Sequence, residues 1–109
     1  MTDDKKTVVT EVGKGEGFKV RIFDLDKGLT EYEHVKIVRI ISKDYNLLIM
    51  EDYLAIIGDV DGSIDIKGED IDIKFPKIRA FYMNSNNVFN LMIKEVVENE
   101  NRWDFTKYN

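Results

Sequence analysis

The chain is dominated by short segments in which apolar and polar residues alternate, and a period of two is that of a β-strand. Residues 18–23 place apolar side chains on one face and Lys19 and Arg21 on the other. Residues 35–41 form the next predicted strand, and its end, Ile40-Ile41, is apolar on both faces. A buried strand has that composition, so this segment is expected to lie inside the fold.

A hairpin is predicted for residues 63–75, because both of its halves alternate isoleucine with charged residues. Gly68-Glu69 between the halves suits a two-residue type II′ turn. That register sets Asp65 opposite Asp72 and gathers the isoleucines on one face, as burial of one face requires. Residues 58–62 are then the turn that precedes the hairpin.

The stretch GDVDGSID, residues 58–65, also has the alternating acids of a calcium loop. With Gly62 at the sixth position of the EF-hand template, Ile57 and Gly68 occupy the first and twelfth positions. Those positions carry an acidic ligand and a bidentate glutamate in a working loop. We therefore interpret the stretch as a turn and a strand, and we predict no metal site.

The C-terminal part of the chain predicts two more strands. Pro76 is expected to end the hairpin, and residues 84–87, Asn-Ser-Asn-Asn, are a strong turn signal after the next strand. Residues 88–97 fit a strand or a helix by pattern. A strand is preferred, because a four-residue loop would set Tyr82 against Phe89 and match apolar faces.

These segments predict an all-β fold, a small single-domain sandwich or barrel of about eight to ten strands with a short polar C-terminal tail. The expected parts are a polar arm over residues 1–17 with a possible short strand at 7–12, the β-sandwich domain over residues 18–97, and a tail over residues 98–109 with Trp103, Phe105 and Tyr108. The tail aromatics are expected either to fold back on the domain or to dock a partner.

Composition limits the number of domains, the kinds of site and the kinds of partner to be expected. The 109 residues suit one domain, and the lack of cysteine excludes disulfides and cysteine-based zinc or iron–sulfur sites. The polar start shows no secretory signal, and no run is long enough to span a bilayer, so we expect a cytoplasmic protein without membrane insertion. The formal charge of −5 is mixed in sign along the chain. Without a basic cluster, direct nucleic-acid binding is not expected, and another protein is the expected partner.

The sequence contains no recognisable set of catalytic residues. His34 is the only histidine and lies beside Glu33, where solvent exposure is the default. Ser42, Ser63 and Ser85 lie in or beside predicted turns, without the pattern of a nucleophile elbow. Since no two carboxylates stand out as an acid and base pair, we predict no enzyme activity and no cofactor.

The best candidate for a partner-binding surface is the segment around residues 47–54. Apolar Met50 and Tyr53 flank two acids that are expected to be exposed, and tyrosine and methionine are favoured at interface cores. An equally weighted alternative is that these side chains pack one end of the domain. The predicted partner-binding residues are Leu48, Met50, Glu51, Asp52, Tyr53 and Leu54.

The order of signals from FKVRIF at residue 18 to GSIDI at residue 66 resembles the N-terminal β-sandwich of the epsilon subunit of rotary ATP synthases. Residues 46–50 match a Glu-Leu-Gly-Ile-Leu segment of that family, and Gly62 matches the glycine before its next strand. Tyr53 stands where the family has histidine, and Glu51-Asp52 replace its Pro-Gly. The family's C-terminal helical hairpin has no counterpart in the twelve residues after Val97. The resemblance implies a sandwich that docks on a rotor stalk and membrane ring.

The predicted function is therefore a non-enzymatic protein-binding or regulatory module with an epsilon-like β-sandwich. The alternative is a small acidic inhibitor, of the kind carried by mobile elements, that blocks a basic nucleic-acid-binding surface of a target protein. Salt should separate the two, because an interaction led by charge weakens with ionic strength and an apolar contact does not. The identity of the partner and the oligomeric state stay open.

Overall fold

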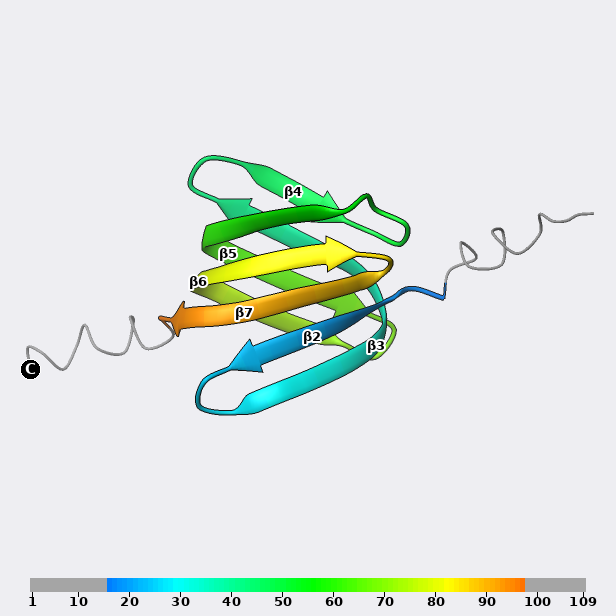
Figure 1. Cartoon of the computed structure of the whole chain (residues 1–109), viewed down its shortest axis with the longest axis horizontal. Helices are drawn as coiled ribbons and strands as arrows, with labels where there is room; N and C mark the ends of the chain where they lie inside the picture. Colours follow the sequence, from blue (N-terminus) through cyan, green and yellow to red (C-terminus); the bar gives the residue numbers. More distant parts are fainter. Residues whose placement is uncertain (1–15, 98–109) are drawn as a thin grey trace, which may run out of the picture.

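The computed structural model describes residues 16–97, which contain six β-strands and no helix. The strands are β2 (Phe18–Asp24), β3 (Gly28–Ser42), β4 (Asn46–Ile49), β5 (Ile56–Gly68), β6 (Asp72–Ser85) and β7 (Val88–Val96), shown in Figure 1. The predicted all-β class is confirmed. The predicted strand at residues 7–12 and the aromatic tail at residues 98–109 lie outside the described residues.

The strands close into a barrel. Their order is β2-β7-β6-β5-β3-β4, and β2 also pairs with β3, so five strands form a ring and β4 flanks β3. The neighbours in the ring are antiparallel except β2 and β7, which are parallel. Closure removes most unpaired strand edges, which are a liability in open sheets.

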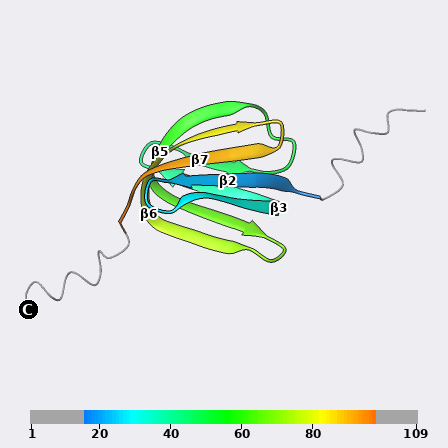
Figure 2. The same cartoon turned by 60° about the horizontal axis from the view of Figure 1, so that its bottom comes forward.

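The barrel has two layers (Figure 1). Each of the three long strands, β3, β5 and β6, bends and contributes residues to both layers. Register shifts mark the bends, near Val35 in β3 and near Gly62 in β5. The front layer holds β2, β7 and residues 28–35, 56–61 and 78–85 of the long strands. The rear layer holds β4 and residues 36–42, 62–68 and 72–75. Figure 2 shows the hairpin of β5 and β6 on the other side of the barrel from β7.

The core lies between the layers and is almost entirely aliphatic and aromatic. Its side chains come from alternate positions of every strand, as the two-residue period requires. The buried apolar residues are Phe18, Val20, Ile22, Val35, Val38, Ile40, Ile49, Val60, Ile64, Ile66, Ile78, Ala80, Tyr82, Phe89 and Leu91.

The described residues hold six strands and not eight to ten, because two predicted breaks lie inside continuous strands. Residues 58–62 were expected to form a turn but belong to β5. Their glycines serve close packing: a Cβ on Gly58 would meet the Tyr82 hydroxyl, and one on Gly62 would collide with the carbonyl oxygen of Ile41. Pro76 was expected to end a strand, but β6 continues through it. Pro76 lies where the β5–β6 register is interrupted, so no ladder hydrogen bond needs its missing N–H.

The predicted hairpin register is wrong by two residues. Asp65 lies opposite Lys74 and not Asp72, and Ile66 lies opposite Ile73, so four residues, 68–71, separate the last paired residues, Lys67 and Asp72. A shift of two keeps every side chain on its predicted face, which is why the alternation alone did not exclude it. The observed register replaces a like-charge pair with an opposite-charge pair.

The connection of β6 to β7 is also tighter than predicted. Asn86 and Asn87 have φ of 51° and 62°, so they form a two-residue turn in which both central residues are left-handed. Asparagine tolerates this conformation better than other non-glycine residues. Tyr82 therefore lies opposite Leu91 and not Phe89. The prediction of a strand over residues 88–97 is confirmed.

Strand β3 begins at Gly28, seven residues before the predicted start at Val35. Residues 28–34 are mostly exposed and carry several polar side chains, so an apolar pattern did not reveal them. His34 interrupts the strand with φ of 59°, at the bulge where β3 passes from the front to the rear layer. Its ring is exposed, as predicted, and lies 3.2 Å from the carbonyl oxygen of Glu16.

Candidate binding surfaces

The predicted partner-binding residues lie in the loop between β4 and β5 and at the end of β4. Some of them reach solvent, and others are held against the barrel. Met50 and Leu54 are 48% and 68% exposed, and Leu48 is exposed on β4 beside them. Tyr53 is half-buried and packs against the core, as the alternative interpretation expected. The apolar side chains that reach solvent are therefore those of Leu48, Met50 and Leu54.

The two acids of this loop hold it in place. Asp52 donates its backbone N–H to the side-chain oxygen of Asn87 at 2.6 Å and accepts from the Asn87 amide at 3.0 Å. Glu51 is half-buried and accepts the N–H of Gly17 at 3.2 Å, and its other oxygen is buried without a hydrogen bond. The expectation of exposed acids is thus wrong for Glu51. The loop is preorganised by its contacts with neighbouring segments.

A tyrosine network joins the connection before β4 to strands β5 and β6. The hydroxyls of Tyr45 and Tyr82 lie 2.8 Å apart, and the Tyr45 hydroxyl also donates to the carbonyl of Asp59. Burial raises the pKa of Tyr82 well above its usual range, and the hydrogen bond with Tyr45 adds to the rise. Tyr82 also stacks on Phe89, with ring centroids 5.7 Å apart. This network is structural and faces the core.

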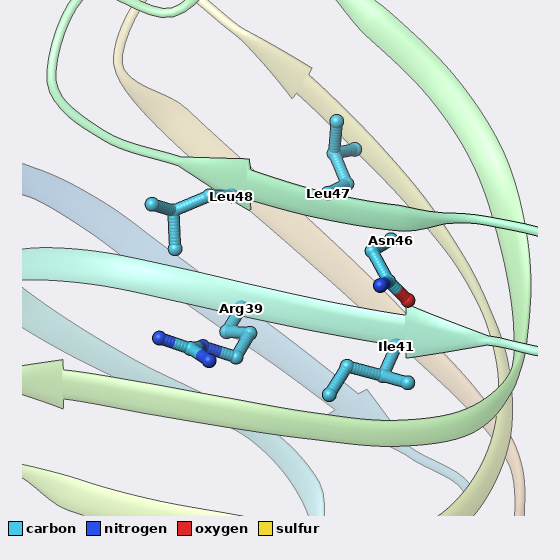
Figure 3. Close-up of a pocket in the computed structure, with 5 residues that line it drawn as sticks. All are labelled: Arg39, Ile41, Asn46, Leu47 and Leu48. Atoms are coloured by element: carbon cyan, nitrogen blue, oxygen red, sulfur yellow. The ribbon is translucent and has the colours of Figure 1, made fainter.

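A shallow hollow of about 320 Å³ lies beside the loop, on the outer face of β3 and β4 (Figure 3). Arg39, Ile41, Asn46, Leu47 and Leu48 line it. In Figure 3 the Arg39 side chain extends along β3 on the side away from β4. The hollow mixes apolar and polar groups and opens widely to solvent.

A larger apolar surface covers the outer face of the front layer, and we call it the front patch. Its side chains point away from the core, and Ile57 and Phe81 are 76% and 47% exposed. The front patch consists of Phe23, Leu29, Ile57, Phe81, Met83 and Met92.

The residues of the front patch are direct neighbours across five strands. Phe81 lies opposite Met92, Met92 opposite Phe23, and Phe23 opposite Leu29. Ile57 lies opposite Met83, two residues along β6 from Phe81. Outward side chains this close form one continuous apolar surface, and such surfaces on soluble domains usually mark contact sites.

Charged side chains border the front patch. The Lys94 amine lies 4.3 Å from the centroid of the Phe81 ring, and the Arg21 guanidinium lies 5.3 Å from that of Phe23. Arg21 also pairs with Glu31 at 2.9 Å, and Arg79 pairs with Glu95 at 3.1 Å. A polar rim around an apolar centre is the usual anatomy of a protein interface.

The front patch was not predicted from the sequence, although one signal for it was present. Residues 80–83, Ala-Phe-Tyr-Met, are apolar on both faces of a strand. The sequence interpretation used only Tyr82, which lies on the inward face with Ala80. The outward Phe81 and Met83 gather with residues far away in the chain, so only the strand order shows that they form a surface.

The residues considered for catalysis are dispersed. Ser42 and Ser85 end strands β3 and β6, and Ser63 lies within β5. Ser42 accepts the N–H of Asp61 at 3.0 Å. Within residues 16–97 no three histidine or acidic side chains gather in a way that would hold a metal ion. The acids of the GDVDGSID stretch lie along a strand, and Asp61 pairs with Lys43 at 3.4 Å.

No helix within the described part of the chain is long and apolar enough to cross a membrane. No protein-family model matches the sequence, and no curated protein is significantly similar to it. Solved structures with this fold include a chain from the cryo-EM structure of the Tetrahymena thermophila mitochondrial ATP synthase, described as central stalk/c-ring. The TM-score is 0.62 at 11% identity, over 76% of this chain and 67% of that chain.

This likeness shows the fold. It agrees with the resemblance inferred from the sequence on one point, which is that a small all-β domain of this kind occurs in an ATP synthase stalk structure. The assignment to the epsilon subunit stays a prediction.

Proposed function

We propose that this chain is a non-enzymatic protein-binding module that docks a protein on its front patch. The observation that carries the proposal is the continuous outward apolar surface from Ile57 to Leu29 across five strands. Burial of exposed apolar area drives most protein association, and aromatic and methionine side chains dominate the energetic centre of interfaces.

The likeness to a chain of an ATP synthase stalk structure supports a role of this general kind, since that protein is part of an assembly. An epsilon-like role, with docking on a rotor stalk and regulation of its motor, is the finer form of the proposal. The loop of Met50 and Leu54 would be the second contact. Its hydrogen bonds hold it in one conformation, so little entropy is lost when it binds.

The acidic-inhibitor alternative requires a surface of one sign. On the two sheet faces of the described residues, acids stand beside cations, as in Arg21–Glu31, Lys43–Asp61 and Arg79–Glu95. Interleaved charges give little long-range field. The apolar front patch is therefore the better-supported contact.

The test is recovery of binding proteins by a tagged chain that is co-expressed with an untagged copy of itself. Phe81→Asp is compared with Ile41→Asp, which places the same charge at an outward and similarly exposed position of the rear layer. A protein that the wild type and Ile41→Asp recover, and that Phe81→Asp recovers about tenfold less, supports the proposal. Met50→Asp reports on the loop in the same way.

Recovery that is equal for Phe81→Asp and wild type would contradict the proposal. Rotor-stalk subunits among the Phe81-dependent proteins would support the epsilon-like form. A nucleic-acid enzyme whose recovery falls steeply with salt would support the inhibitor alternative.

A further inference from the structure

Among residues 16–97, the charges of the front face are paired with two exceptions, and those exceptions have opposite signs. Cross-strand ion pairs join Arg21 to Glu31, Lys19 to Glu33 and Arg79 to Glu95. Within residues 16–97, Asp59 and Lys94 make no ion pair. Both are exposed on the outward side of their strands.

Asp59 and Lys94 flank the same ring from the two strands beside it. Asp59 on β5 lies directly opposite Phe81 on β6. Lys94 on β7 holds its amine 4.3 Å from the centre of the Phe81 ring. The front layer therefore presents an acid, an aromatic ring and a base in that order, across β5, β6 and β7.

We propose that the protein docked on the front patch is a second copy of this chain, in a face-to-face dimer with its two-fold axis along β6. Such an axis exchanges β5 and β7 between facing copies. Phe81 then packs against Phe81 of the other copy, and Lys94 of each copy meets Asp59 of the other. A two-fold contact is isologous, so one unpaired acid and one unpaired base on either side of the axis yield two ion pairs.

The apolar neighbours fit the same arrangement. Met83 lies two residues from Phe81 on β6, close to the axis, and Ile57 and Met92 lie on the exchanged strands β5 and β7. All four are exposed in the single chain. The contact thus has an apolar centre between two charge pairs, and the charges fix its register and orientation.

This inference rests on the proposed function, since it names the protein that the front patch binds. The test is sedimentation equilibrium of the purified full chain from roughly 1 μM to several hundred μM, the range in which weak dimers dissociate. The wild type is expected to be a dimer at the upper end and to dissociate on dilution. Phe81→Asp is expected to stay monomeric, and Ile41→Asp to dimerise like the wild type.

Charge reversal identifies the register. Lys94→Asp and Asp59→Lys each bring like charges together across the axis and should raise the dimer Kd about tenfold or more. The double variant exchanges the two charges and should return the Kd to within about threefold of the wild type. Far-ultraviolet circular dichroism checks that each variant is folded, and Phe81→Ser replaces Phe81→Asp if the latter unfolds.

A wild type that is monomeric throughout, a Phe81→Asp dimer of unchanged Kd, or a double variant that does not recover would each overturn the dimer. A monomer in sedimentation, together with Phe81-dependent recovery of a different protein, removes the dimer and leaves the proposed function standing. Loss of Phe81 dependence in both assays removes both.

Discussion

The outer faces of the two layers differ sharply although the same strands build them. In the front layer the row that crosses the sheet at Phe81 continues through Met92 and Phe23 to Leu29. In the rear layer the row at Asp65 has Lys74 on one side and Arg39 on the other. From Phe81 to Leu29 the first row is apolar, and Asp59 lies at its other end, opposite Phe81. The second row alternates in charge.

The change takes place within single strands. β5 carries exposed Ile57 before its bend at Gly62 and the charged residues Asp65 and Lys67 after it. The two-residue period continues throughout, so it reports which residues share a face and not whether that face meets water or a partner. The rear outer face carries alternating charges, and the front outer face carries the apolar front patch.

The sharpest test of this difference uses two adjacent residues of β6 that point to opposite sides. Tyr82→Ala removes a buried ring that stacks on Phe89 and should lower the free energy of unfolding by about 3–5 kcal/mol. Phe81→Ala removes an outward ring and should change it by less than about 1 kcal/mol. Urea denaturation of dilute protein measures both. A loss at Phe81 as large as that at Tyr82 would mean that the front patch belongs to the core.

The sequence was sufficient for the fold class and for most inward faces. The alternation of residues 18–23 and of residues 63–67 placed Val20 and Ile66 in the core, where the structure has them. Those predictions hold because burial of one face constrains every second residue. The choice between sandwich and barrel depended on the pairing of β2 with β7, which are far apart in the chain and carry no local signal.

Glycine and turn chemistry account for the remaining differences. Gly58 and Gly62 were interpreted as turn residues, but the structure uses them where a backbone or a hydroxyl approaches closely. The loop acids were expected to be exposed, which holds for Asp52 and fails for Glu51. The hydrogen-bond partners of the two acids, Asn87 and Gly17, are more than thirty positions away. Contacts of that range are set by topology and not by local pattern.

The loop that carries the chain from the rear layer to the front provides the next test. Asp52 has φ of 64° and exchanges two hydrogen bonds with Asn87. Asp52→Ala keeps an unfavourable left-handed backbone and loses a side-chain bond, so it should cost about 1–2 kcal/mol. Asp52→Asn, which tolerates the same backbone and keeps an acceptor, is the control and should cost less.

Thermal unfolding of the two variants, with hydrogen exchange across residues 50–55, measures this effect. Faster exchange confined to the loop in Asp52→Ala would show that the hydrogen bonds preorganise it. Equal stability and exchange in Asp52→Ala and wild type would remove the case for a rigid second contact.

The smallest expected effect on the free energy of unfolding comes from a comparison of two aspartates of β5. Both point outward, one in each layer. Asp65→Lys in the rear layer would put a third cation between Lys74 and Arg39 and should cost about 0.5–1 kcal/mol at low salt. Asp59→Lys in the front layer has Phe81 opposite it and no cation partner to lose within the described residues, so the monomer should be nearly unaffected. Screening should shrink the first cost as salt rises and leave the second unchanged. Urea denaturation at low and high salt measures both costs. Equal costs for the two variants would show that the two outer faces are electrostatically alike. The contrast between a solvent face and a contact face would then rest on apolar area alone.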